Sequence, residues 1–174
     1  MSKTARLGLA LGAGLTVIGL MATVGPLSAA ASSDTHSTTA NVAVNPVITL
    51  SGLTSSFTLT GNPGATAAAN SAVTMNVRTN NITGYSVSVQ AASANMAGAT
   101  SGNTDVIPVS ALSVRETGTT PFSALSNTAP VTVHTQATRS AAAGDTVNND
   151  FSVAVPFVNS DTYSATLNYV AATQ

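Results

Sequence analysis

The sequence predicts an all-β protein, an immunoglobulin-like antiparallel β-sandwich of about eight or nine short strands. Apolar and polar residues alternate with a period of two in one run after another, which is typical of half-buried antiparallel strands. These runs recur at intervals of roughly ten residues and are separated by turns rich in Gly, Pro and Asn. No long segment shows the 3.6-residue period of an amphipathic helix.

The N-terminal segment has the pattern of a secretory signal peptide, which we expect to comprise residues 1–31. Lys3 and Arg6 form a basic start, an uncharged apolar stretch follows, and a run of small residues ends at Ala31. The apolar stretch is long enough to make an uncleaved membrane anchor the alternative, but Pro26 favours cleavage. We therefore expect a secreted protein, extracellular or associated with the cell wall, that meets a membrane only if this segment is retained.

Two regions are expected behind the signal peptide. Residues 32–40, SSDTHSTTA, are small and polar and predict a flexible leader. Residues 41–174 have the length of a single domain, which we expect to be the β-sandwich.

Two strands and a turn are expected at the start of this domain. Residues 42–50 alternate, but Pro46 lies among them, so this is an edge strand or a broken one. Residues 53–60 alternate again around Phe57, and the sequence GNPGA at 61–65 predicts a turn.

The next two strands flank a short polar loop. Residues 73–77 and 85–89 alternate on either side of TNNITG, which predicts a β-hairpin with Gly84 at positive φ. Ile82 is the apolar member of this loop, and it either caps the core or presents itself to a partner. We interpret the loop first as a turn and second as a recognition tip.

The second half of the chain continues the pattern. Residues 91–104 predict a loop, with Met96 under the sheet. Residues 137–149 predict a second long loop. Further strands are expected over 107–116, 122–125, 131–133, 151–157 and 163–169, and in the fourth of these Phe151, Val153, Val155 and Phe157 share one face.

Tyr163 stands directly after a turn, at the start of the last strand. In many immunoglobulin-like sandwiches a tyrosine so placed closes one end of the core while its hydroxyl bonds back to the main chain. We expect this structural role for Tyr163.

The charged residues exclude several partners and modes of attachment. Behind the signal peptide, three arginines stand against six carboxylates, so the net charge is −3 and no basic patch forms. Nucleic acid and anionic lipid are thereby excluded as electrostatic partners. The chain has no Cys for a disulfide or a lipid anchor, and its one lysine, Lys3, lies in the signal peptide. Sortase-built pili and Lys–Asn isopeptide bonds both need a lysine amine, so neither is expected.

The pattern of reactive side chains in the sequence predicts neither an enzyme nor a bound cofactor. His36 lies in the leader, and His134 should face solvent because Val131 and Val133 point the other way. No G-x-S-x-G motif occurs, and no spacing singles out a catalytic pair of carboxylates. Two distant histidines do not make a zinc site.

A calcium site has more support in the sequence than a zinc site. The sequence GDTVNND places the oxygen ligands Asp145, Asn148, Asn149 and Asp150 in one expected loop, although without the spacing of an EF-hand. Asp161 could join them only if two loops share an end of the sandwich. Asn and Asp also fill ordinary turns, so we expect no bound metal and keep Asp145, Asn148 and Asp150 as the calcium alternative.

Three stretches carry a resemblance: TLTGNPGATAAANSAVTMNVRTNNITGYSVSVQA, IPVSALSVRETG and FVNSDTYSATLNYVA. They resemble a group of small secreted proteins of Streptomyces and related actinobacteria without an assigned activity. More distantly, TNNITGYSVSVQA and DTYSATLNYVA resemble WxL-type cell-surface domains, which implies non-covalent association with the Gram-positive wall. The chain has no Trp, so the name-giving motif is absent and no binding residues are carried over.

Three functional hypotheses follow. The first is a secreted, non-enzymatic structural protein of the cell envelope or extracellular matrix, whose loops 91–105 and 137–149 contact wall polymer or a surface protein. The alternative is a self-assembling fibre or coat subunit, in which residues 32–44 add as a strand to the next copy. The third is an enzyme acting through His134, Glu116 or Asp150.

Overall fold

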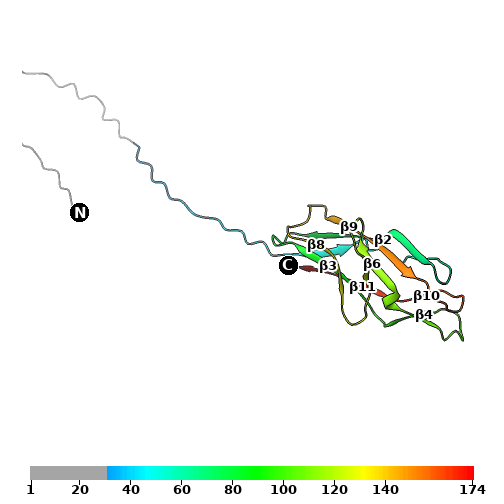
Figure 1. Cartoon of the computed structure of the whole chain (residues 1–174). Coiled ribbons are helices and arrows are strands. Elements are labelled where there is room, and N and C mark those ends of the chain that lie inside the picture. Colours follow the sequence, from blue (N-terminus) through cyan, green and yellow to red (C-terminus); the bar gives the residue numbers. More distant parts are fainter. Residues whose placement is uncertain (1–30) are drawn as a thin grey trace, which may run out of the picture. The chain divides into compact units, whose positions relative to one another are not determined.

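The computed structural model describes residues 31–174, whose path Figure 1 shows. The predicted signal peptide lies outside the described residues except for Ala31. The chain divides into two units, Met1–Val42 and Ala43–Gln174, and all described strands belong to the second. Residues 31–47 are exposed and have no regular secondary structure. Within the described range, no helix is long and apolar enough to cross a membrane.

Antiparallel strands form three sheets in the described part of the chain, which confirms the predicted all-β fold class. They number eleven there, more than predicted, because several are only two to four residues long. The sheets have the orders β1-β2-β9-β6-β7, β11-β3-β8 and β10-β4-β5. The bounds are β1 Ile48–Ser51, β2 Thr66–Thr79, β3 Tyr85–Ala91, β4 Asn95–Gly98, β5 Val106–Pro108, β6 Leu112–Glu116, β7 Ser123–Ala124, β8 Val131–Gln136, β9 Asp145–Ala154, β10 Tyr163–Ser164 and β11 Leu167–Thr173, with a 3₁₀ turn η1 at Val109–Ala111.

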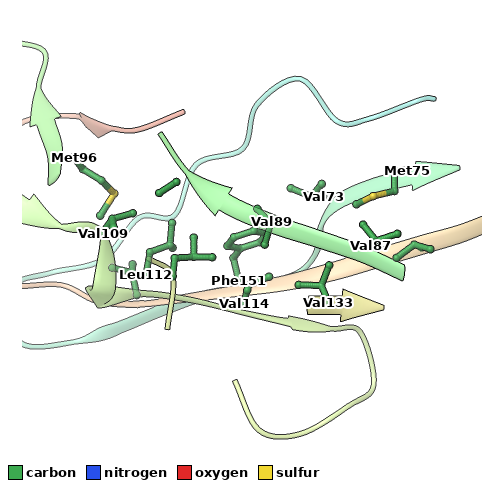
Figure 2. Close-up of a cluster of buried hydrophobic side chains, with 14 of the residues drawn as sticks. Val73, Met75, Val87, Val89, Met96, Val109, Leu112, Val114, Val133 and Phe151 are labelled. Atoms are coloured by element: carbon green, nitrogen blue, oxygen red, sulfur yellow. The ribbon is translucent and has the colours of Figure 1, made fainter. Parts of the chain in front are cut away.

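The five-stranded sheet and the sheet β11-β3-β8 share one hydrophobic core (Figure 2). Val87 and Val89 of β3 and Phe151 of β9 are fully buried within it. The ring of Phe57 lies 4.5 Å from that of Phe151 and covers it from the segment between β1 and β2. Alternation along the strands therefore sorts side chains as predicted, with valines inward and serines and threonines outward.

The connection between β2 and β3 crosses from one sheet to another, so the predicted β-hairpin is wrong. β2 pairs with β1 and β9, whereas β3 pairs with β11 and β8. Alternation identifies both strands but not their partners. Gly84 has a φ of +88° in this connection, and the Gln136 carbonyl oxygen lies only 1.8 Å from where a Cβ would stand.

The first two predicted strands are mostly absent from the sheets. Of the predicted strand 42–50 only residues 48–50 pair, within β1, which lies at a sheet edge as Pro46 predicted. Residues 53–60 form no strand. Thr54 donates its amide to the carbonyl of Thr74 at 3.0 Å, and the chain then runs on to place Phe57 over the core instead of extending a ladder.

The two predicted loops are shorter than expected. Residues 91–104 contain β4, whose pairing with β5 buries Met96. Residues 137–149 contain the first half of β9, which begins at Asp145. Both stretches consist mostly of Ala and polar residues, so their strands show little alternation of large apolar residues in the sequence.

Phe157 points into solvent with 95 % of its surface exposed, which corrects the prediction that it lies inward. β9 ends at Ala154, and Pro156 has no amide hydrogen with which to continue the ladder. Val155 exchanges main-chain hydrogen bonds with Gly64 and Ala65, so the chain leaves the sheet before Phe157.

Candidate functional site

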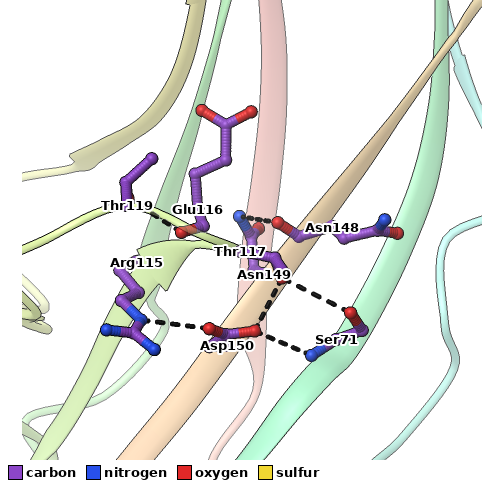
Figure 3. Close-up of polar contacts among 8 residues, drawn as sticks. All are labelled: Ser71, Arg115, Glu116, Thr117, Thr119, Asn148, Asn149 and Asp150. Carbon is purple, nitrogen blue, oxygen red and sulfur yellow. Dashed lines mark hydrogen bonds and ion pairs between the residues drawn. The ribbon is translucent and has the colours of Figure 1, made fainter.

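Asp150 is the centre of a buried polar cluster on the outer side of the five-stranded sheet (Figure 3). Its carboxylate accepts hydrogen bonds from the Ser71 amide at 2.8 Å, the Thr117 hydroxyl at 2.6 Å and Arg115 Nε at 3.0 Å. Burial alone would raise the pKa of this carboxyl, but these three donors outweigh it and lower the pKa. The Arg115 guanidinium also lies 4.3 Å from the centre of the Phe122 ring.

Asp145 belongs to a second, separate cluster. It accepts hydrogen bonds from the Tyr85 hydroxyl at 2.9 Å, from Gln136 Nε2 at 3.0 Å and from the Ala141 amide at 3.0 Å. Burial opposes ionisation of this carboxyl, yet the three bonds together hold its pKa below the usual range. Burial and the hydrogen bond to Asp145 raise the pKa of the Tyr85 phenol, which stays a donor.

The predicted calcium loop is therefore corrected: Asp145, Asn148 and Asp150 lie on strand β9 and not in a loop. Asp145 and Asp150 are five positions apart, so they point to opposite faces of the strand and enter different clusters. Asp161 accepts bonds from a third group of donors. Within the described range, no three His, Asp or Glu side chains are grouped to hold a metal.

Asp161 and Tyr163 fasten the loops at one end of the sandwich. Asp161 accepts bonds from the amide and hydroxyl of Thr100, both at 2.9 Å, and from Asn103 Nδ2 at 2.7 Å. These donors lower the pKa of its carboxyl. The Tyr163 hydroxyl donates to the Asn159 carbonyl at 2.9 Å, four residues upstream, which is the main-chain bond expected of this tyrosine. The predicted recognition loop 91–105 is thus held in place by side chains.

His134 points inward, contrary to the prediction that it faces solvent. β8 carries one residue more than β3 at this point, since Val87 pairs with His134 while Ser88 pairs with Thr132. This bulge at Val133 reverses the alternation that follows it. His134 is packed against the Tyr85 ring at 5.3 Å, and only 16 % of its side chain is exposed.

Glu116 binds His134, with 2.7 Å between Oε1 and Nδ1. The pair borders a shallow cavity of about 240 Å³ between β6 and β8. The other ring nitrogen of His134 is buried and has no hydrogen-bond partner among residues 31–174. Asp150 enters its own cluster, so the three residues of the enzyme hypothesis do not form one constellation.

The outer face of the sheet β11-β3-β8 is mostly polar and has no charged side chains. On the central strand β3, Ser86, Ser88 and Gln90 point outward, alternating with buried valines. Each lies beside outward residues of the neighbouring strands, and Ser88 is paired with both Val170 and Thr132. The other outward residues are Asn168 and Ala172 of β11 and Thr135 of β8.

Sequence reasoning did not single out this face. The alternation of serine with valine in YSVSVQ signals one outward polar row, but the neighbouring rows come from strands about 45 and 80 residues away along the chain. Their adjacency depends on strand order, which no local pattern contains.

Comparison of the chain with protein-family models and with curated proteins finds no match.

Proposed function

We propose that this protein is a secreted, non-enzymatic component of the cell envelope or extracellular matrix whose β-sandwich binds cell-wall polymer non-covalently. The observation that carries the proposal is the uncharged outer face of β11-β3-β8, three strands wide. Antiparallel pairing holds its hydroxyl and amide groups at fixed spacings.

The chemistry of this face suits a neutral glycan. Serine and threonine hydroxyls both donate and accept hydrogen bonds, as sugar hydroxyls do, and Asn168 adds an amide. Exposed Val170, beside Ser88 on the edge strand β11, offers an apolar contact to sugar C–H groups. Binding through many uncharged contacts is weakly dependent on salt, which is appropriate for a wall component.

The reactive side chains are engaged in contacts within the fold, which supports the non-enzymatic part of the proposal. Asp145 and Asp150 are occupied by three donors each, and His134 is packed between Glu116 and Tyr85. These groups hold strands together, so the proposed role is presentation of a rigid surface.

The test is co-sedimentation of residues 32–174 with purified Gram-positive cell walls. Ser88→Glu puts a charge at the centre of the proposed face, and Ser152→Glu is the matched control, since Ser152 is an outward, half-buried serine on the central strand β9 of the other sheet. We expect Ser88→Glu to weaken wall binding at least about tenfold, or ~1.4 kcal/mol, and Ser152→Glu to leave it unchanged. Equal binding by both variants, or equal loss, would contradict the proposal.

A second candidate function, self-assembly by N-terminal strand addition, is favoured by the segment before β1. Val42 and Val44 alternate like a strand, yet they are 88 % and 77 % exposed and have no sheet partner among the described residues. Such a segment could pair with an open sheet edge of another copy. Val42→Asp with Val44→Asp should then abolish large assemblies in wall-free solution; unchanged assemblies would exclude this mechanism.

A further inference from the structure

The sandwich has two ends of different chemistry, defined by the pairing of β2 with β9. Val77 pairs with Asp145 at one end, and Thr66 pairs with Ala154 at the other. A strand of 14 residues separates the ends by about 40 Å. Figure 1 shows β4 and β10 at the end opposite the C-terminus.

The first end holds a groove of about 800 Å³, which we call the arginine groove. Arg78, on the outer side of β2 opposite Thr49, and Arg139, from the loop between β8 and β9, both line it. Of the three arginines in residues 31–174, these two form no ion pair, whereas Arg115 is paired with Asp150. Val47 and the methyl groups of Ala141 and Ala142 give the groove an apolar part.

One carboxylate lies near this groove but is already occupied. Asp145 accepts the Ala141 amide, and its remaining bonds go to Tyr85 and Gln136 on the inner side. The guanidinium groups of Arg78 and Arg139 are thus the charges that the groove presents to solvent.

The opposite end, which we call the Phe157 end, combines an apolar side chain with negative charge. Phe157 is the most exposed large apolar residue of the described chain. Asp105 and Asp161 lie in the same loop cluster: Asp105 accepts the Asn159 amide at 2.8 Å, and Asp161 accepts from Thr100 and Asn103. None of the three arginines of residues 31–174 lies at this end.

The segment that carries Phe157 is also anchored on both sides. Val155 is fixed by main-chain bonds to Gly64 and Ala65, and Asn159 is fixed by Asp105 and Tyr163. An exposed phenylalanine on an anchored segment loses little conformational freedom when it docks, which favours binding.

We propose that the Phe157 end of one molecule docks into the arginine groove of a second molecule. Phe157 packs against Val47, Ala141 and Ala142, while the acidic loop cluster faces Arg78 and Arg139. An apolar anchor surrounded by complementary charge is the usual anatomy of a protein interface. Because the two surfaces are different and lie at opposite ends, the contact is head-to-tail and builds linear chains of molecules. This inference does not depend on wall binding.

Sedimentation velocity of residues 32–174 without cell walls, over a concentration series, tests the proposal. We expect the wild-type protein to form oligomers that grow with concentration and dissociate when salt is added, because the charged part of the contact is screened. Phe157→Ser and the double variant Arg78→Glu/Arg139→Glu should each remain monomeric. Ile82→Ser is the matched control, since Ile82 is similarly exposed but does not line the groove, and it should assemble as the wild type does.

Mixing the two monomeric variants gives the decisive result. The Phe157→Ser protein keeps an intact groove, and the arginine double variant keeps an intact Phe157 end, so their mixture should form one-to-one pairs that grow no further. A wild-type protein that stays monomeric at every concentration, or a mixture that does not pair, would overturn the proposal. So would assembly that survives both sets of substitutions and is lost only with Val42→Asp/Val44→Asp, because that result assigns assembly to strand addition. Unchanged thermal midpoints show that each variant is folded.

Discussion

The carboxylate of Asp150 accepts a hydrogen bond of 2.8 Å from the main-chain amide of Ser71, 79 positions earlier in the chain. Ser71 has a φ of +48° and is the one non-glycine residue at positive φ among the described residues. It stands where the register of β2 and β9 shifts, between Ala69 and Val73. Asp150 therefore fastens the bulge of β2 and, through Arg115 and Thr117, joins it to β6 and the turn that follows.

Replacing Asp150 should destabilise the fold. Asp150→Ala leaves the Ser71 amide, the Thr117 hydroxyl and the Arg115 guanidinium without their acceptor, and we expect a loss of about 3 kcal/mol in the free energy of unfolding. Asp34→Ala is the control, since that carboxylate is exposed and binds only His36, and it should change stability by less than about 0.5 kcal/mol. Urea unfolding of both variants measures this, and similar values for the two would contradict the structural role of Asp150.

Stability should fall in acid. The pKa values of Asp145, Asp150 and Asp161 are lowered in the folded protein, so near pH 4 the unfolded chain binds more protons than the folded one. Their contribution is present above the unfolded carboxyl pKa of about 3.9 and is lost as the pH falls through the lower folded values. Thermal midpoints across this range measure the effect. Asp150→Asn should flatten the curve, and a curve parallel to that of the wild type would contradict the assignment.

Two tyrosines with different surroundings form a matched pair. Tyr163→Phe removes the bond to the Asn159 carbonyl and should cost about 1 kcal/mol and speed amide hydrogen exchange in residues 99–105. The hydroxyl of Tyr169 is buried without a hydrogen-bond partner in the described residues, so Tyr169→Phe should be neutral or stabilising. Chemical unfolding of both variants distinguishes them, and a larger loss from Tyr169→Phe would show that the two roles are reversed.

Two glycines at similar φ should respond differently to alanine. Gly84→Ala places a Cβ against the Gln136 carbonyl and should cost at least about 3 kcal/mol, through strain and collision together. Gly64 has a φ of +83°, but no atom lies within 4 Å of the position of a new Cβ. Gly64→Ala should therefore lower the free energy of unfolding by only about 1 kcal/mol. Equal thermal midpoints for the two variants would show that the collision at Gly84 is relieved without cost.

Local patterns in the sequence predicted the strands more reliably than their partners. The alternation in YSVSVQ identifies β3, and the turn chemistry of TNNITG identifies the need for Gly84. Both signals act over a few residues. The partner of each strand is determined by packing across the whole domain, so the expected hairpin is in fact a connection between sheets.

The prediction of side-chain direction was wrong where the backbone departs from regular alternation. His134 turns inward because of a bulge in β8, and Phe157 turns outward because β9 has already ended. Asp150 lies on the outer face of its sheet, as alternation requires, and is buried there in a cluster with Arg115, Thr117 and Ser71. Those partners come from distant segments of the chain, and no spacing in the sequence predicts them.

The most direct test of wall binding through the β11-β3-β8 face is an NMR titration of the ¹⁵N-labelled protein, residues 32–174, with soluble fragments of cell-wall glycan. We predict that the largest amide shift changes fall on the outward residues of this sheet, centred on Ser88, and that Ser88→Glu abolishes them. Changes confined to the loops 99–105 or 137–144, or no changes at concentrations where intact walls bind the protein, would contradict the account.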